Sequence, residues 1–399
     1  MDLIIRNARL LGAPEHAPVD IGIRSGQIIA IETNLMANAP VFDAEGHLAC
    51  AGLVETHLHL DKSRIIDRCP QPDDRDADAM ARVAAVKPKF TEADVYRRAS
   101  RTVEACIQHG TTRMRTHVEL DAGVELRSFD ALETLRTDYA SVIEIELCVF
   151  PQEGLTNNPR SDELLVEALK RGARVIGGAP DHDPDKAGHI RRIFELAREY
   201  DVDIDMHLDA GDSSGDMDIH LVCELTRQYR LGGRVTVGHG CRYSTLPPPA
   251  FQALAGEIAD AGVAVTVLPA TDLFMTGRVA DANALVQNRV NCSIASGHVL
   301  DPYTPYGDGN LIRLVNLQAN VCRIEGAEGL RQCFYMVTER AAMVMNLRDY
   351  GIAIGNPADV VIMDATTPEQ AVAELRGPLT VFRRGERTVI RPRAELHRP

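Results

Sequence analysis

Apolar and polar positions repeat with two different periods, and the two periods alternate along most of the chain. Eight apolar runs of strand length are separated by segments with apolar residues at positions i, i+3 and i+4, as in residues 162–172 and 188–200. The first pattern is typical of buried strands and the second of amphipathic helices. The eight expected strands cover residues 53–60, 111–120, 143–151, 173–180, 202–209, 234–240, 263–270 and 291–298.

The two ends of the chain have a third pattern, short β-type runs broken by Gly, Asn and Ser. Such runs are typical of a small antiparallel sheet. Strands at both ends predict one small domain built from both termini, and the alternating β/α units between them predict a parallel barrel with helices outside. The terminal runs cover residues 2–10, 21–32, 40–49, 351–364 and 378–390.

Composition places the chain among ordinary globular proteins and excludes some partners. The 399 residues are 45% hydrophobic and 25% charged, with a formal net charge of −14. Nucleic acids and anionic membrane surfaces need clustered Lys and Arg, so we expect neither as a partner. The start of the chain lacks the pattern of a signal peptide, and no apolar run reaches the roughly 18–20 residues of a membrane span. Nine cysteines without a CxxC pair predict free thiols, and we expect a cytoplasmic protein.

Histidines gather at the C-terminal ends of the expected barrel strands. In a parallel barrel the chemistry lies at this face, and thirteen histidines placed at random would seldom fall there so often. Residues 64–90, the longest stretch without an expected strand, are interpreted as an active-site loop leading into a helix. Five of the eight runs carry a histidine at or near that end: His57 with His59, His117, His207, His239 and His298.

The pair His57 and His59 is the strongest metal signal. Period-2 alternation points both imidazoles to the same side of one strand end, and Asp61 and Lys62 follow at the expected barrel mouth. His207, in DIDMHLDAGD, is a third candidate ligand. Neutral imidazole binds zinc, iron, nickel and copper, so these residues leave the metal open. The other three strand-end histidines could each be a ligand, a substrate contact or a packed polar residue.

Several longer motifs carry a family resemblance: AGLVETHLHLDK, MRTHVEL, VFPQEGL, YDVDIDMHLD, RVTVGHG and DPYTPYGDGN. With them the chain resembles the cytosine deaminase branch of the amidohydrolase superfamily over nearly its whole length, and YDVDID and HLDK also resemble the triazine-degrading amidohydrolases of that branch. The resemblance implies an α/β fold, a (β/α)8 TIM barrel with a small β-sandwich domain. Here the barrel would be residues 49–348, and the β-sandwich residues 1–48 and 349–399.

The resemblance also implies a metal site and its surroundings. Gln152 would hydrogen-bond a substrate amide, His117 would line the pocket, and His239 would face the water or the attacked carbon. One divalent ion is expected, zinc by default with iron as the alternative, and its ligands would be His57, His59 and His207.

Two positions depart from the branch pattern. Members carry a general acid/base Glu three residues after the fifth-strand histidine, where this chain has Ala210, and a metal-binding Asp at the end of the eighth strand, where it has Gly297. Cleavage of a C–N bond needs proton transfers, so another group has to carry the protons. The nearest carboxylate after Gly297, Asp301, is assigned to the following loop. The sequence leaves open which group acts, and the candidates are Asp209, Asp212, His239 and His298.

Two functions from different classes therefore stay open. The first is a metal-dependent amidohydrolase, a deaminase or cyclic amide hydrolase, that cleaves a C–N bond of a small nitrogen heterocycle. The second is a non-hydrolytic binding or regulatory relative that kept the barrel but lost the acid/base pair, and a metal-assisted lyase or isomerase is a third alternative. In each case we expect a small-molecule partner and a homo-oligomer. The pocket residues that favour a polar ligand over a lipid or peptide are His117, Gln152, Asp181, His182 and His239.

Overall fold

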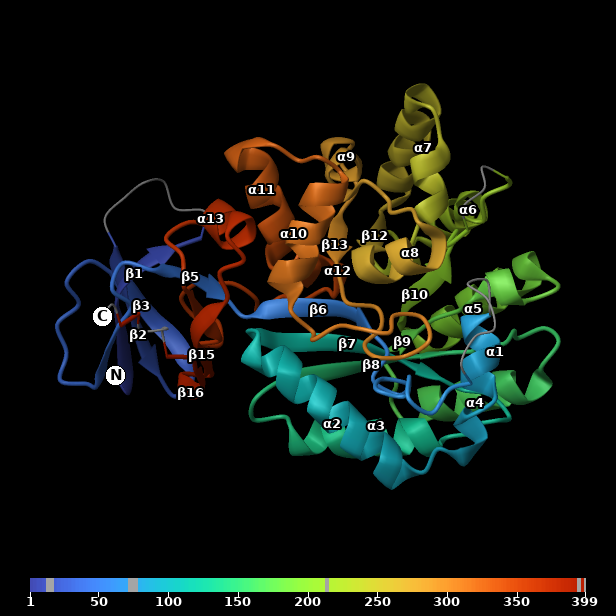
Figure 1. The fold of residues 1–399 in the computed structure, drawn as a ribbon, viewed down its shortest axis with the longest axis horizontal. Coiled ribbons are helices and arrows are strands. Elements are labelled where there is room, and N and C mark those ends of the chain that lie inside the picture. The colour runs from blue at the N-terminus through green and yellow to red at the C-terminus, as the bar shows by residue number, and fades with distance from the viewer. Residues whose placement is uncertain (12–17, 71–77, 212–214, 393–395, 398–399) are drawn as a thin grey trace.

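A computed structural model describes residues 1–11, 18–70, 78–211, 215–392 and 396–397. This part of the chain forms two eight-stranded sheets. One is a parallel barrel flanked by helices, and the other is a smaller sheet of strands from both ends of the chain, at the left of Figure 1. The predicted fold class is confirmed.

The barrel contains all eight predicted strands in chain order, and each pairs in parallel with the next. The seam between the first and last strands is closed at Gly297, whose N–H donates to the carbonyl of His57 at 2.8 Å and whose carbonyl accepts from the N–H of His59 at 2.9 Å. The strands are β6 (Leu53–Leu58), β7 (Thr111–Glu119), β8 (Glu144–Phe150), β9 (Val175–Ile176), β10 (Asp203–Leu208), β11 (Val235–His239), β12 (Val263–Val267) and β13 (Cys292–Ile294).

Helices surround this barrel, which explains why its strands are buried on both faces. All nine residues of β7 are buried, as expected for a parallel strand covered on both sides. Several helices begin at a capping side chain, for example Thr91, which accepts from the N–H of Asp94. The helices are α1 (Ala79–Ala84), α2 (Glu92–Gln108), α3 (Arg127–Asp138), α4 (Pro159–Lys170), α5 (Lys186–Tyr200), α6 (Ile219–Tyr229), α7 (Pro248–Ala261), α8 (Pro269–Thr276), α9 (Ala282–Gln287), α10 (Leu311–Val321), α11 (Gly326–Tyr335), α12 (Glu339–Val344) and α13 (Pro368–Ala373), with short 3-10 turns η1 (Lys87–Lys89), η2 (Pro180–His182) and η3 (Cys241–Thr245).

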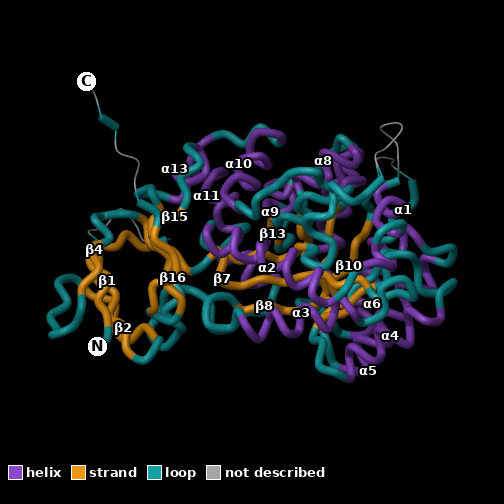
Figure 2. The backbone as a smooth tube through the Cα atoms, turned by 60° about the horizontal axis from the view of Figure 1, so that its bottom comes forward, coloured by secondary structure: helices purple, strands orange, loops and turns teal. Residues whose placement is uncertain are grey.

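The smaller sheet is mostly antiparallel and is formed by both ends of the chain (Figure 2). Its first strand joins two halves, because residues 4–6 pair with β4 and residues 9–10 pair with β5. The two halves share an apolar core that includes Ile5, Ile23, Val360 and Phe382. The strands are β1 (Leu3–Leu10), β2 (Val19–Arg24), β3 (Gln27–Glu32), β4 (Val41–Asp43), β5 (Leu48–Ala51), β14 (Val360–Met363), β15 (Pro378–Arg383) and β16 (Glu386–Ile390).

The two parts of the molecule meet between β5 and β6. Strand β5 pairs with β1 and β14 of the smaller sheet, so the expected boundary after residue 48 falls inside this strand. Helix α13, from the C-terminal segment, contacts α10 and α11 beside the barrel. Gly52 alone separates β5 from the first barrel strand.

Three further expectations can be compared with the described residues. The interpreted active-site loop, residues 64–90, contains α1 and η1, and its residues 71–77 lie outside the description. All nine cysteines are free, and eight of them are buried. Within the described ranges, none of the helices is both long and apolar enough to cross a membrane.

Candidate functional site

Three imidazoles converge at the C-terminal end of the barrel. His57 lies near the end of β6, His59 directly follows this strand, and His207 lies near the end of β10. Nε2 of His207 is 3.2 Å from Nε2 of His57 and 3.0 Å from Nε2 of His59. Nitrogen ligands placed tetrahedrally about 2.0–2.1 Å from one ion are separated by roughly 3.3 Å. The three side chains therefore fit a single divalent ion.

The opposite nitrogens of the three rings face oxygen atoms. Nδ1 of His57 is 3.8 Å from Asp205 and Nδ1 of His59 is 3.9 Å from Asp61, while Nδ1 of His207 is 3.3 Å from a backbone carbonyl. The contacts of His57 and His59 are too long for hydrogen bonds. The negative carboxylates nonetheless favour the proton on Nδ1 over Nε2, as the carbonyl does for His207, and this leaves the Nε2 lone pairs for a metal. Burial lowers the pKa of all three imidazoles well below the usual value, so the rings are neutral, as metal ligands have to be.

His117 lies behind His57 and not on the wall of a cavity. The two rings stack with centroids 3.7 Å apart, and Nε2 of His117 is 3.5 Å from Oδ1 of Asp205. Arg115 donates to the other oxygen of Asp205 at 2.8 Å and to Glu146 at 2.7 Å. His117 is thus part of the buried support beneath the imidazoles. The resemblance implies that His117 lines the pocket, but in the structure it does not.

A cavity of about 400 Å³ opens beside the imidazoles. This volume is typical of a small-molecule site. His207 lines it, and Met80 and Met275 add apolar surface. The other expected site residues that line the cavity are Gln152, Asp181, His182, His239 and His298.

His239 is held by a carboxylate from the next strand–helix connection. Its Nδ1 lies 2.6 Å from Oδ1 of Asp272, whose other oxygen accepts from the N–H of Leu268 at 3.2 Å. His239 has φ +75°, a conformation that few non-glycine residues adopt and that clusters at active sites. Because Nδ1 donates to Asp272, the lone pair of the neutral ring is on Nε2.

His298 forms a second histidine–carboxylate pair on the cavity wall. Its Nδ1 lies 2.7 Å from Oδ2 of Asp301, and the other oxygen of Asp301 accepts from the N–H groups of Tyr303 and Thr304. The ring stacks between His59 and Tyr303, with centroids 4.2 and 4.4 Å away. Asp301 does belong to the following loop, as expected, but its carboxylate holds a pocket histidine.

Asp209 faces away from the cavity. Its carboxylate accepts from the N–H groups of Asp218 and Ile219, at the start of α6, and from the hydroxyl of Tyr243. Strand alternation predicts the side of His207, but β10 ends at Leu208 and Asp209 has φ +52°, so the alternation no longer applies. The candidate Asp212 lies outside the described residues.

Ala210 and Gly297 stand where the family resemblance predicts carboxylates, and the space around the two residues differs. Ala210 lines the cavity, so a longer side chain there would enter it. Gly297 has φ +67°, and a Cβ at this position would lie 2.8 Å from Oγ1 of Thr271 and 3.2 Å from Leu268. A side chain at position 297 therefore requires Thr271 to shift, whereas a side chain at position 210 would extend into the cavity.

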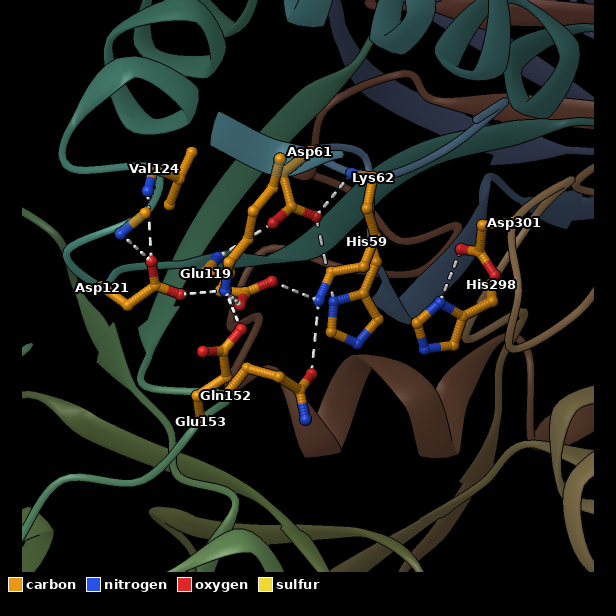
Figure 3. A network of polar contacts seen from close by, with 12 residues as sticks. His59, Asp61, Lys62, Glu119, Asp121, Val124, Gln152, Glu153, His298 and Asp301 are labelled. Carbon is orange, nitrogen blue, oxygen red and sulfur yellow. Dashed lines mark hydrogen bonds and ion pairs between the residues drawn. The ribbon is translucent and has the colours of Figure 1, made fainter. Parts of the chain in front are cut away.

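A cluster of charged side chains, most of them buried, lies next to Gln152, which lines the cavity (Figure 3). We call Lys62, Lys87, Glu119, Asp121 and Glu153 the lysine cluster. The Lys62 ammonium donates to Glu119 at 2.8 Å, and the Lys87 ammonium donates to Glu119 at 2.6 Å and to Asp121 and Glu153. Burial would lower the pKa of Lys87, but the neighbouring carboxylates of Glu119 and Asp121 raise it above the usual value. Both lysines are therefore cationic in the interior.

Part of the remaining wall carries exposed charge. Asp181, from η2, pairs with Lys186 and lies 3.9 Å from Arg242. The same lysine reaches Asp218 at 3.5 Å. These charges balance one another in the folded chain, so the wall as a whole favours a polar ligand without a large charge.

Two residues of the site and its surroundings, Asp272 and Lys87, do not lie at strand ends, so the search for polar residues at strand ends missed them. Asp272 lies five residues beyond β12, inside α8, and contacts a histidine on the preceding strand. Lys87 lies in η1, within the stretch without expected strands. An acidic residue just after a Pro at a helix start, as in LPATD, is the one sequence signal for Asp272.

The sequence matches the amidohydrolase family over residues 73–389. It is 27% identical over 395 residues to N-isopropylammelide isopropyl amidohydrolase of Pseudomonas sp. (strain ADP), covering 96% of each chain. It is 23% identical over 391 residues to pterin deaminase of Rhizobium rhizogenes, covering 92% of this chain and 89% of that one.

Solved structures give the same relationship. The fold is similar to that of 5-methylcytosine deaminase from Klebsiella pneumoniae, with a TM-score of 0.93, 27% identity and coverage of 99% of both chains. It is also similar to N-isopropylammelide isopropylaminohydrolase from Burkholderia multivorans, with a TM-score of 0.87, 28% identity and coverage of 97% and 98%. The predicted resemblance and the predicted class, a hydrolase of carbon–nitrogen bonds other than peptide bonds, are confirmed.

Proposed function

The chain belongs to the amidohydrolase family, and we propose that it uses one divalent ion to cleave a C–N bond of a small nitrogen heterocycle. The observation that carries the proposal is the convergence of three neutral Nε2 atoms beside a cavity that also holds two histidine–carboxylate pairs. The residues that would hold the ion are His57, His59 and His207. Bound there, a divalent ion supplies Lewis-acid chemistry and lowers the pKa of a water molecule towards neutrality.

The protein itself supplies the proton carriers. His239 can accept a proton at Nε2 while Asp272 stabilises the imidazolium that forms, and it can then return the proton to the leaving nitrogen. His298, held in the same way by Asp301, is a second carrier on the cavity wall. We propose that these pairs take over the proton transfers for which Ala210 and Gly297 offer no carboxylate.

The substrate class follows from the cavity and from the relatives. The names of the relatives specify alkylamino-triazine, pterin and methylcytosine rings, all nitrogen heterocycles with an exocyclic nitrogen. The cavity has polar groups that can hydrogen-bond the nitrogen atoms of such a ring, and two methionines that can contact its flat face. A deaminase or a cyclic amide hydrolase acting on such a ring is the function that we propose.

A substrate screen tests the proposal. Zinc-loaded protein is incubated with amino- and alkylamino-substituted pyrimidines, pterins, triazines and cyclic amides, and released ammonia or amine is measured. We expect turnover of at least one ring, reduced about 10²–10⁴-fold in His239→Asn and Asp272→Asn, as general acid–base residues typically contribute that much. His220→Ala is the matched control, because His220 lies exposed on α6 and pairs with Glu257.

The outcomes separate the two functions that the sequence leaves open. Turnover that survives both substitutions would contradict the role proposed for His239. Binding of a ring without release of a nitrogen product, in protein that holds stoichiometric zinc, would favour the non-hydrolytic relative. In that case Ala210→Glu, which returns a carboxylate to the cavity wall, is the variant in which hydrolysis is expected to appear.

A further inference from the structure

Lys62 lies beside Gln152 at the cavity wall but is itself 1% exposed. Its ammonium donates to Oε2 of Glu119 at 2.8 Å and to Oε1 of Gln152 at 3.2 Å (Figure 3). An ammonium group has three donors and no acceptor, so the carboxamide atom that faces it has to be the oxygen. Nε2 of Gln152 points away from Lys62 (Figure 3), in a residue that lines the cavity.

The position of Lys62 is fixed by its neighbours. Asp61 accepts from the N–H of Lys62 at 2.8 Å and from the N–H of Glu119 at 3.0 Å, which ties the turn after β6 to the end of β7. The rings of Phe150 and Tyr303 lie 5.3 and 5.7 Å from the ammonium. Burial would lower the pKa of Lys62, but the carboxylates of Glu119 and Asp61 raise it above the usual value. The donor that faces Gln152 is therefore a permanent one.

The segment that carries Gln152 is also held in place. Glu153, the next residue, is paired with Lys87. Two residues further on, the N–H of Leu155 donates to Asp183 at 2.6 Å, and the N–H after it donates to the same carboxylate. The backbone on the C-terminal side of Gln152 is thus anchored, and the orientation of its carboxamide is the remaining freedom.

We infer that Lys62 is a positioning residue that turns the NH₂ group of Gln152 towards the substrate. A reversed carboxamide would place two donors against each other and lose a charge-assisted hydrogen bond. The site therefore offers a fixed donor, which selects rings with a carbonyl oxygen or an unprotonated ring nitrogen at that edge over rings with only N–H groups there. This inference rests on the proposed function and specifies its substrate class.

Two small rings of the same shape serve as probes. 2-Piperidone presents a carbonyl oxygen, whereas protonated 2-iminopiperidine presents an NH₂ group in the same place and has donors only. Their dissociation constants for zinc-loaded protein are measured by ligand-observed NMR, and the ratio of the two constants is compared across variants. Binding that depends only on an intact fold would weaken both probes equally and leave the ratio unchanged.

We expect Gln152→Glu to move the ratio towards 2-iminopiperidine by about tenfold or more, because a carboxylate accepts on both sides while its contact with Lys62 is kept. Lys62→Met frees the carboxamide to reverse, and the ratio should move in the same direction by a smaller factor. Arg383→Met is the matched control, since it also removes one buried cation, but one that lies on β15 of the smaller sheet and pairs with Asp359, and its ratio should match the wild type. A ratio that stays within twofold in Gln152→Glu, or that shifts equally in Lys62→Met and Arg383→Met, would overturn the inference.

A neutron structure of the deuterium-exchanged, zinc-loaded protein reads the orientation without any ligand. Deuterons of Gln152 on the cavity side support the inference, and deuterons facing Lys62 overturn it. Because this measurement uses the unmodified protein, it decides the orientation even if Lys62→Met does not fold. If neither probe binds at millimolar concentration, the proposed function fails for cyclic amides and amidines, while the neutron map still decides the orientation.

Discussion

Two groups of mostly buried polar side chains lie at the same end of the barrel, and they avoid the cost of burying unpaired charge in opposite ways. The first, which we call the imidazole cluster, consists of His57, His59, His117 and His207 with Asp205. The rings of His57, His59 and His207 are neutral, and several nitrogens of the cluster lack a hydrogen-bond partner among the described residues. The lysine cluster is fully ionic, and each of its ammonium groups contacts carboxylates directly.

The difference concerns where the cation comes from. Glu119, Asp121 and Glu153 place carboxylate oxygens close enough together to hold a metal ion, but the ammonium of Lys87 already occupies that place. In the imidazole cluster, no cationic side chain of the described residues contacts the Nε2 atoms of His57, His59 and His207, and these three atoms converge on one point. One cluster is complete in the chain alone, whereas the proposed function completes the other with an ion from solution.

Loss of the ion should have the largest effect. His207→Ala removes the imidazole whose Nε2 is close to both other ligands, so we expect the loss of stoichiometric zinc and a fall in hydrolysis of about 10³-fold or more, the several kcal/mol that a catalytic metal supplies. Elemental analysis and amine release measure the two effects. Zinc retained at one equivalent with a near wild-type rate would show that the ion binds elsewhere.

The lysine cluster should instead respond in stability. Lys87→Met leaves the buried carboxylates of Glu119 and Asp121, and the partly exposed Glu153, without their shared cation. We expect the free energy of unfolding to fall by about 3–5 kcal/mol, with zinc content unchanged in the folded fraction. Urea denaturation measures the change. Arg160→Met, which breaks an exposed pair with Glu125, is the control and should change the free energy of unfolding far less, because exposed ion pairs are screened by solvent. Equal losses in both variants would contradict the contrast between the clusters.

Asp205 connects the imidazole cluster to the protein interior. Its carboxylate faces Nδ1 of His57 and is itself held by Arg115, so Asp205→Asn should weaken zinc binding about 10–100-fold, as is typical for such supporting carboxylates. Competition with a chromogenic chelator measures the affinity. Asp203→Asn changes a partly exposed residue on the same strand, paired with Arg234, and should leave the affinity unaltered. A wild-type zinc affinity in Asp205→Asn would show that Asp205 does not support the metal ligands.

The smallest effect concerns pH. Burial and the neighbouring Glu119 raise the pKa of Asp121 to about 6, above its unfolded value of about 3.9. This carboxyl therefore stabilises the fold below the unfolded pKa and loses that contribution as the pH rises through about 6. The free energy of unfolding of the wild type minus that of Asp121→Asn should fall by about 1–2 kcal/mol between pH 4 and pH 7. A difference that stays constant or rises over this range would be the opposite result.

The sequence predicts the barrel well because its signals are local. Each barrel strand is an apolar run between helical patterns, and the pair His57 and His59 needs only period-2 alternation to point both rings the same way. His207 follows from the same reasoning at a different strand end. These features depend on neighbours within a few residues, which is the range over which a sequence pattern can be interpreted.

The rest of the site depends on contacts that no local pattern contains. Asp272 reaches His239 across 33 positions, and Lys87 reaches Glu119 across 32. Asp209 turns away because its backbone is left-handed, which strand alternation cannot predict. His117 is on the inner side of its strand, but alternation gives a direction and not a depth, so its place beneath His57 was not predictable.

Gly297 also constrains the evolutionary history of this chain. Its backbone is left-handed, and the hydroxyl of Thr271 lies 2.8 Å from the point that a Cβ would occupy, so no side chain can be added there by one mutation without a clash. An aspartate at this position would need Thr271 to shift or to change first, because its hydroxyl takes up the space. The order of substitutions is therefore restricted, and a carboxylate can be introduced more readily at Ala210, which lines the cavity, than at Gly297.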